Sequence, residues 1–167
     1  MEYKKLSKKA KQSWFLSRLV ATIITGILLV GGEWIVNYKL KLEFTLMFKT
    51  PINIIIIIIL LLLLLNTFVY PIIEYKQWEY MINEDKVDFK EGIFSIKRTI
   101  IPMIRIQHIV INEGFINRIF SLASIDIHTA GGVHTIPNLE LKDAKEISEY
   151  LRSKISEKVE DENDTYN

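Results

Sequence analysis

The chain has 167 residues, carries 21 lysines and arginines against 20 aspartates and glutamates, and contains no cysteine. The lack of cysteine excludes disulfides, thiol catalysis and cysteine-based metal sites. The net charge of +1 is too small for a polyanion-binding chain, so we expect no nucleic-acid partner.

The chain begins with a basic segment, residues 1–13, whose charged side chains are lysines apart from Glu2. Lysines next to a membrane attract anionic lipid by about 1 kcal/mol each. We therefore expect a cytoplasmic leader that lies against the inner face of the membrane. Its lysines are Lys4, Lys5, Lys8, Lys9 and Lys11.

An apolar stretch over residues 14–36 predicts the first membrane span. Trp14 and Trp34 stand at its two ends, where interfacial tryptophans are typical. A basic start followed by an apolar run is also the pattern of a signal peptide. The run is long for a signal peptide and no convincing small-x-small cleavage site follows, so we favour a retained transmembrane helix.

Residues 37–50 form the predicted outer loop, in which apolar and polar side chains alternate from Tyr38 to Lys49. This period of two is typical of a one-sided strand. Such a strand would expose an edge able to pair with another chain or an extracellular peptide. The same residues also suit a loop in the headgroup region or a continuation of the helices, and both interpretations stay open.

The second predicted span, residues 52–73, contains an unbroken run of isoleucines and leucines from residue 54 to residue 65. About 20 apolar residues, at a rise of ~1.5 Å each, cover the roughly 30 Å hydrocarbon core of a bilayer. We expect Pro71 to end this helix, so that residues 14–74 form a transmembrane hairpin. The basic residues on its flanks predict that both termini lie inside and the loop outside.

Short β-rich runs separated by turns predict a soluble domain over residues 75–156. The predicted strands cover residues 78–82, 87–90, 93–101, 104–111, 123–129 and 133–136. Pro137 is expected to end the last strand. In the fourth strand the apolar and polar side chains exchange faces near Gln107, which predicts a β-bulge. Residues 115–120 suit a helical turn.

An apolar stripe at three- and four-residue steps predicts an amphipathic helix at the end of this domain. The stripe consists of Leu141, Ala144, Ile147, Leu151 and Ile155. Residues 157–167 are acidic and polar, which predicts a disordered tail. The expected fold is a two-helix transmembrane hairpin followed by an α+β split β-barrel that is capped by a C-terminal α-helix.

Seven short motifs of the soluble domain point to a known family. They are Trp78-Glu79-Tyr80, Glu91-Gly92-Ile93-Phe94, Ile101-Pro102, Arg105-Ile106-Gln107, Arg118-Ile119-Phe120, Leu122-Ala123 and Thr129-Ala130-Gly131-Gly132. In order and spacing they resemble the bacterial pleckstrin-homology-like (PH-like) domain of the YdbS-like membrane proteins. The resemblance covers residues 75–155 and implies a PH-like barrel on the cytoplasmic side of a bacterial plasma membrane, without an assigned catalytic activity.

The resemblance also assigns expected structural roles to several residues. They are Trp78, Gly92, Pro102, Arg105, Gln107, Arg118, Gly131 and Gly132. Ser121 departs from the family pattern, because such sequences usually have glycine there. Glycine adopts positive φ readily and serine does so at a cost, which puts the backbone angle at Ser121 in question.

Four basic residues are the candidates for a ligand site, and above all for lipid headgroups. They are Lys97, Arg98, Arg105 and Arg118. Eukaryotic PH domains hold phosphoinositides with basic residues in a loop that corresponds to residues 83–86 here. That loop is acidic in this chain, which argues against phosphoinositide binding. Arg105 and Gln107 can instead satisfy buried or edge backbone groups.

His128 and His134 flank the glycine turn, and Asp126 shares a strand face with His128. A metal or acid–base site is conceivable there, but the spacing fits no established ligand motif. We expect no metal, no cofactor and no catalytic residue.

These observations favour a non-enzymatic, membrane-anchored binding or scaffold protein whose PH-like domain mediates protein–protein assembly at the inner membrane face. The expected partners are the lipid bilayer and either a larger multi-PH-domain relative or a second copy of the chain. Two alternatives remain. One is a factor for envelope stress or antimicrobial-peptide resistance that acts through the spans and outer loop, and the other is a lipid-headgroup-binding module.

Overall fold

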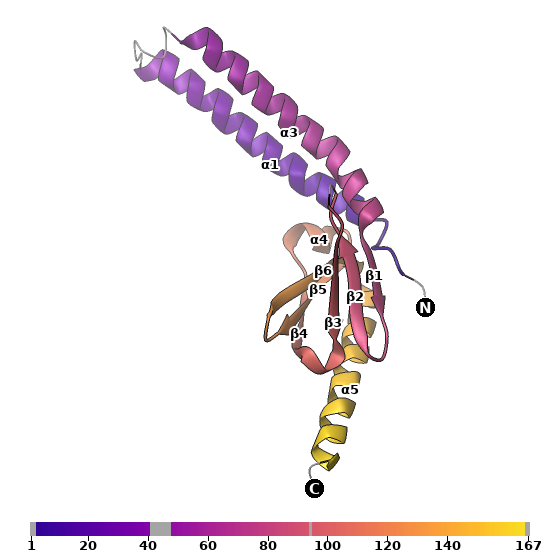
Figure 1. Cartoon of the computed structure of the whole chain (residues 1–167). Coiled ribbons are helices and arrows are strands. Elements are labelled where there is room, and N and C mark those ends of the chain that lie inside the picture. The colour runs from indigo at the N-terminus through magenta and orange to yellow at the C-terminus, as the bar shows by residue number, and fades with distance from the viewer. Residues whose placement is uncertain (1–2, 41–47, 94, 166–167) are drawn as a thin grey trace. The chain divides into compact units, whose positions relative to one another are not determined.

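The computed structural model describes residues 3–40, 48–93 and 95–165, and the chain divides into two compact units (Figure 1). The span unit comprises residues 14–72. The soluble unit comprises residues 1–13 together with residues 73–167.

The span unit is a pair of long apolar helices, as predicted. Helix α1 (Ala10–Trp34) continues into a π-helical segment, η1 (Ile35–Leu40), and helix α3 (Lys49–Gln77) follows. Both helices are long and apolar enough to cross a bilayer. Most of the predicted strand-like alternation falls on residues 41–47, which lie outside the described residues, and its described flanks are helical.

Several side-chain pairs join α1 and α3, and three of them lie in the first half of α1. They are Phe15 with Phe68, Arg18 with Tyr70, and Thr22 with Thr67. The Thr22 and Thr67 hydroxyls share a buried hydrogen bond of 2.9 Å, and the Thr67 hydroxyl also donates to the Leu63 carbonyl at 2.9 Å. Both hydroxyls therefore have partners without water, as the interior of a membrane helix pair requires.

The predicted end of the second span at Pro71 is wrong, because α3 continues through this residue to Gln77. Proline removes one backbone donor, the one that would bond the carbonyl of Thr67. Transmembrane helices tolerate this loss where neighbouring groups compensate, and both Pro71 and Thr67 are buried.

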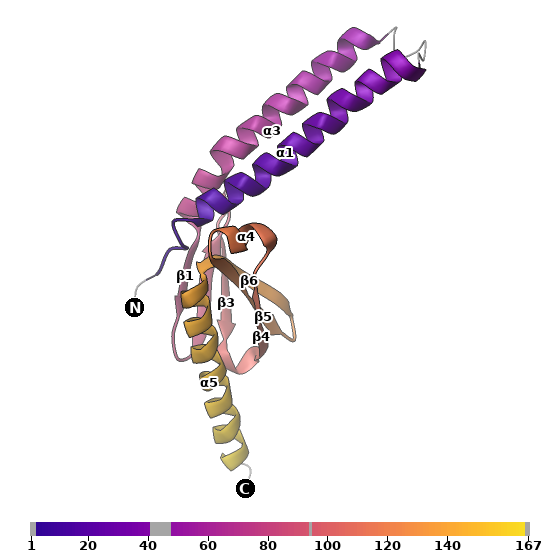
Figure 2. The ribbon, with the colours of Figure 1, turned by 180° about the vertical axis from the view of Figure 1, so that it is seen from behind.

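The soluble unit is built from two antiparallel three-stranded sheets and a long C-terminal helix (Figures 1 and 2). The first sheet contains β1 (Glu79–Ile82), β2 (Lys86–Glu91) and β3 (Lys97–Pro102), and the second contains β4 (Ile106–Asn112), β5 (Leu122–Thr129) and β6 (Gly132–Glu140). A 3-10 turn, η2 (Met103–Arg105), links the sheets, helix α4 (Phe115–Ile119) links β4 to β5, and α5 (Leu141–Thr165) follows β6. This is the expected split barrel with a C-terminal helix.

The core lies between the two sheets and α5. Its members include Val87, Phe89 and Ile101 from the first sheet, Ile125, Ile127 and Ile136 from the second, and Ala144 and Leu151 from α5. Trp78 stacks on the Phe89 ring, and Phe89 meets the edge of His134 on β6. The aromatic residues of the first sheet thus reach across the barrel to the second.

Two strands differ from their predicted extent for local reasons. Strand β3 begins at Lys97 because the chain turns tightly after Gly92, whose φ of 118° favours glycine. Strand β6 continues past Pro137 to Glu140, although we expected Pro137 to end it. The register shifts opposite this proline, and β6 is the edge of its sheet, so both conditions that permit a strand proline are met.

The register of β4 confirms the predicted bulge, which lies between Ile106 and His108. Ser121 adopts φ 56°, so serine occupies a left-handed position where the family resemblance implied glycine. Its backbone joins two elements, because its N–H donates to Arg118 and its carbonyl accepts from Leu141.

The basic leader is part of the soluble unit and pairs with the free edge of β1. The Lys4 N–H donates to the Tyr80 carbonyl at 2.8 Å, and the Tyr80 N–H returns a bond to Lys4 at 2.9 Å. Leu6 and Ala10 are buried. The described part of the leader is therefore packed onto the soluble unit, and its contact with anionic lipid stays a prediction.

The acidic residues after position 156 are helical, where the sequence predicts a disordered tail. Helix α5 runs to Thr165. Lysine and glutamate are good helix formers, and a salt bridge of 2.6 Å joins Lys154 to Glu157, one turn apart, across the predicted boundary.

Candidate functional site

The soluble unit has a cleft of about 500 Å³ at the rim between its two sheets. One wall is the end of β3 with η2, and the other is the turn between β5 and β6. The cleft is lined by Ile100, Ile101, Pro102, Ile104, Arg105, Gln107, Thr129, Ala130, Gly131 and His134.

Local structure explains why these residues face one space. The 3-10 turn η2 presents Arg105, and the bulge that follows places Gln107 beside it. On the opposite wall the Thr129 hydroxyl accepts from the Gly131 N–H at 3.2 Å and donates to the Gly132 carbonyl at 3.0 Å. Gly132 has a φ of 134°, which only glycine adopts readily. Three of the family motifs thus form the two walls of one cleft.

The lining combines exposed apolar and unpaired polar side chains. Ile104 is 67% exposed and Ile100 is 48% exposed. Within the described residues, neither Arg105 nor Gln107 has a side-chain hydrogen bond or ion pair. The alternative prediction, that these two residues tie buried or edge backbone groups, is therefore not met. Among the residues that the structure describes, no acidic side chain lines the cleft, so its chemistry suits an apolar ligand that carries a carboxylate or another hydrogen-bond acceptor.

The four predicted basic ligands do not form one site, because only Arg105 lines the cleft. Lys97 forms an exposed salt bridge of 3.6 Å with Glu91. Arg118 lies on α4. Arg98 forms an ion pair with Asp88.

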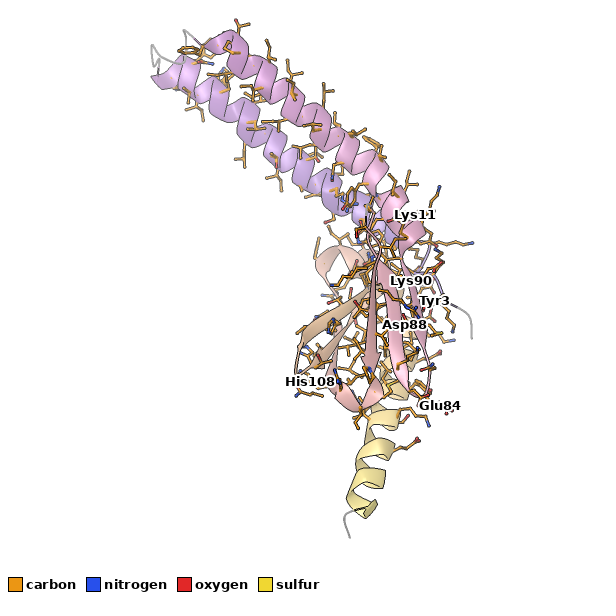
Figure 3. All side chains as sticks on the ribbon, viewed as in Figure 1. Tyr3, Lys11, Glu84, Asp88, Lys90 and His108 are labelled. Carbon is orange, nitrogen blue, oxygen red and sulfur yellow. The ribbon has the colours of Figure 1, made fainter. Side chains whose placement is uncertain are left out.

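Asp88 is the most buried charged side chain among the described residues of the soluble unit, and it forms an ion pair with Arg98. Arg98 donates from Nε to Oδ1 of Asp88 at 3.0 Å and from Nη2 to Oδ2 at 2.6 Å. The Tyr3 hydroxyl donates to Oδ2 at 3.0 Å, and both residues are labelled beside the first sheet in Figure 3. Asp88 is 0% exposed. The hydrogen bonds from Arg98 hold the pKa of the Asp88 carboxyl below its usual range.

Sequence reasoning missed Asp88 because it lies between Val87 and Phe89 in a strand that alternates core-facing and outward-facing positions. An outward aspartate on such a strand normally meets water. Tyr3 lies 85 positions away and covers it, and nothing near Asp88 in the sequence indicates that contact.

The histidines considered for a metal site are divided between two faces of the second sheet. His128 stacks on His108, its cross-strand partner, at a centroid distance of 4.0 Å. His134 is opposite Ile127, whose side chain faces the core. Among the residues that the structure describes, no three histidine, aspartate or glutamate side chains gather as a metal site would require.

The span unit contains a polar cluster at the end of α1, which no local pattern of the sequence indicates. Asn37, in the π-helical segment, donates to Glu33 at 3.1 Å, and the Asn53 amide nitrogen, assigned to face the same carboxylate, donates to it as well. Glu33 and Asn37 also line a pocket of about 220 Å³. The other residues that line this pocket are apolar, so the polar cluster between the two helices has apolar surroundings.

The chain matches the Bacterial PH domain family over residues 19–155, which is most of its length. The transmembrane protein YdbS of Bacillus subtilis (strain 168) is 34% identical over 87 residues, or 52% of this chain and 55% of YdbS. The transmembrane protein YdbT of the same organism is 30% identical over 97 residues, or 56% of this chain and 20% of YdbT. The aligned part thus spans about half of YdbS and a fifth of YdbT, and no solved structure matches. The chain is a membrane protein that belongs to the bacterial PH domain family.

Proposed function

We propose that this protein is a non-enzymatic, membrane-anchored binding protein that holds a protein partner at the inner face of a bacterial plasma membrane. The observation that carries the proposal is the rim cleft, where family-motif residues present Arg105 and Gln107 without partners among the described residues. Both termini lie on the cytoplasmic side in this proposal, because the basic residues are concentrated there.

The cleft favours an extended peptide segment over a small molecule. Strand β3 is the edge of its sheet, so its outer backbone groups are available for pairing. Ile100 and Ile104 offer apolar contact beside that edge. Arg105 offers a planar fork for a carboxylate. The expected ligand is a strand with apolar side chains and one acidic residue.

The proposed partner is a larger relative of this chain, because the part matched here covers only 20% of YdbT and such a relative is long enough to carry further domains. A second copy of this chain is the alternative partner. Both belong to the same class of function, which is assembly of PH-like domains at the membrane.

Site-specific photocrosslinking in intact membranes tests this function. A photoreactive phenylalanine analogue at Ile104 in the cleft should form a discrete, stoichiometric protein adduct, and the same analogue at Tyr150 on α5 should not. Arg105→Glu should abolish the adduct, because it places a negative charge where the ligand carboxylate binds. Arg152→Glu, an equal charge change on exposed α5, should leave the adduct intact.

Mass spectrometry of the adduct then identifies the partner as a relative or as a tagged second copy. Equal yields from Ile104 and Tyr150, or an adduct that Arg105→Glu does not reduce, would disprove the cleft as the binding site.

A further inference from the structure

Helix α4 presents the most exposed large apolar side chain of the described soluble unit, Phe115, together with a second exposed apolar residue, Ile119. Phe115 is 83% exposed and Ile119 is 59% exposed. The two residues are four positions apart, so they lie on one face of the turn. Phe89, in contrast, is 2% exposed in the core. A phenylalanine left in water forgoes the favourable free energy of apolar burial, so this face is suited to a second apolar surface.

The position of α4 within the soluble unit indicates which surface that is. The Ser13 hydroxyl donates to the Asn117 side-chain oxygen at 2.6 Å. Ser13 is the last residue of the soluble unit before the chain enters the spans at Trp14. Lys11 lies 4.3 Å from the ring of Tyr75, which is among the first residues after the spans. Helix α4 therefore lies at the end of the unit where the chain leaves for the bilayer and returns from it.

We propose that α4 is a membrane-contact element, in which Phe115 and Ile119 insert into the interface of the bilayer that the spans cross and Arg118 binds lipid phosphate. Aromatic side chains are favoured at the level of the headgroups. Arginine can lay its aliphatic stem on the apolar region while its guanidinium reaches the phosphates. Within the described residues Arg118 has no acidic partner.

This surface is separate from the proposed peptide site, because no residue of α4 lines the rim cleft. The two proposals can therefore fail independently. The bilayer is favoured over a second protein because the covalent connections at Ser13 and Ile73 keep this end of the unit close to lipid whatever else binds.

Spin labels on single cysteines test the proposal, since the chain has no native cysteine. The full chain is reconstituted in nanodiscs of phosphatidylcholine and phosphatidylglycerol, with a nitroxide at Phe115→Cys or Ile119→Cys. The control is Ile104→Cys, which is somewhat more exposed than Ile119 and lies in the cleft. Power saturation then measures the accessibility of each label to apolar oxygen and to a water-soluble nickel chelate.

The labels on α4 should be accessible to oxygen and protected from the chelate, whereas the label at Ile104 should be accessible to the chelate. Chelate accessibility at all three positions would overturn the proposal, since α4 would then be in water. Protection of the α4 labels from both reagents would also overturn it, because that pattern marks burial against protein.

The role of Arg118 has its own measurement in the same discs. Arg118→Gln should increase chelate accessibility at the Ile119 label when phosphatidylglycerol is present, and Arg152→Gln on α5 should not. If Arg118→Gln leaves the accessibility unchanged, the phosphate contact is wrong.

Discussion

The soluble unit and the span unit each contain a carboxylate inside a packed environment, and they accommodate it in different ways. Asp88 is completely buried and is matched by the guanidinium of Arg98 together with the Tyr3 hydroxyl. Glu33 is only partly buried and is met by the amides of Asn37 and Asn53, which carry no charge. The more deeply buried carboxylate, that of Asp88, is thus the one that is paired with a cation.

The difference follows from the cost of removing a charge from water. A fully buried carboxylate needs an opposite charge and several hydrogen bonds. The side chain of Arg98 remains 50% exposed, so only one member of the ion pair loses most of its hydration. Glu33 lies near the end of α1 and remains partly exposed, so neutral donors suffice. A cation that was a candidate ligand group is therefore explained as a counter-ion.

Loss of the Asp88 carboxylate should have the largest effect. Asp88→Asn leaves the fork of Arg98 without its charged acceptor and should lower the free energy of unfolding of the soluble unit by about 2 kcal/mol. Hydrogen exchange of the β2 and β3 amides in the full chain measures this loss. Glu91→Gln, which removes only an exposed salt bridge, is the control and should change it by less than about 0.5 kcal/mol. Equal effects of the two variants would contradict the comparison.

The ion pair of Asp88 and Arg98 also predicts that the stability of the soluble unit decreases at acid pH. Because Arg98 lowers the pKa of Asp88 in the folded state, the stabilisation is present above the ordinary aspartate pKa of about 3.9 and is lost as pH falls through the lower, folded value. The thermal midpoint of the soluble unit should therefore fall below about pH 4 more steeply in the wild type than in Asp88→Asn. Parallel profiles for the two proteins would rule out this source of the acid dependence.

The neutral contacts of the span unit should matter least. Thr22→Val removes the hydrogen bond to Thr67 and should destabilise the helix pair by about 0.6 kcal/mol, the usual size for such contacts in membranes. Detergent-induced unfolding measures the change. Thr25→Val on the same helix is the control, since Thr25 has no described hydrogen bond across the pair. A loss as large as that of Asp88→Asn would remove the distinction between the two units.

Features with a local period could be predicted from the sequence. The apolar runs gave both spans, because only a membrane helix needs so many aliphatic side chains in sequence. The exchange of faces at Gln107 predicted the bulge, and the stripe containing Ala144 and Leu151 predicted the buried face of α5. Such patterns report burial directly, since period and face are linked.

Features that depend on distant pairing could not be predicted. The leader bonds to β1 across more than 70 positions, and the Tyr3 hydroxyl reaches Asp88 across 85. The tolerance of Pro137 depends on the register of β6, which a single strand does not reveal. From the local sequence, a proline predicts the end of a strand. Its effect on stability depends on whether a neighbouring strand would otherwise accept a hydrogen bond from the backbone N–H that proline lacks.

The candidate site was predicted only in part. Family resemblance singled out Arg105, Gln107 and Gly131 one by one, but their common cleft depends on how the β5–β6 turn faces η2. Arg98 and Arg105 have the same charge and similar sequence surroundings. Only the three-dimensional position of Asp88 shows that Arg98 is a counter-ion, whereas Arg105 lines the cleft.

The two hydrogen bonds between Lys4 and Tyr80 also constrain the membrane topology of the chain. Two residues that share backbone hydrogen bonds must be in the same aqueous compartment. The polypeptide between them can therefore cross the bilayer only an even number of times, which agrees with two membrane-spanning helices and requires no count of basic residues. It also sets a condition on assembly, because this strand pairing can form only while the leader and Tyr80 are on the same side of the membrane.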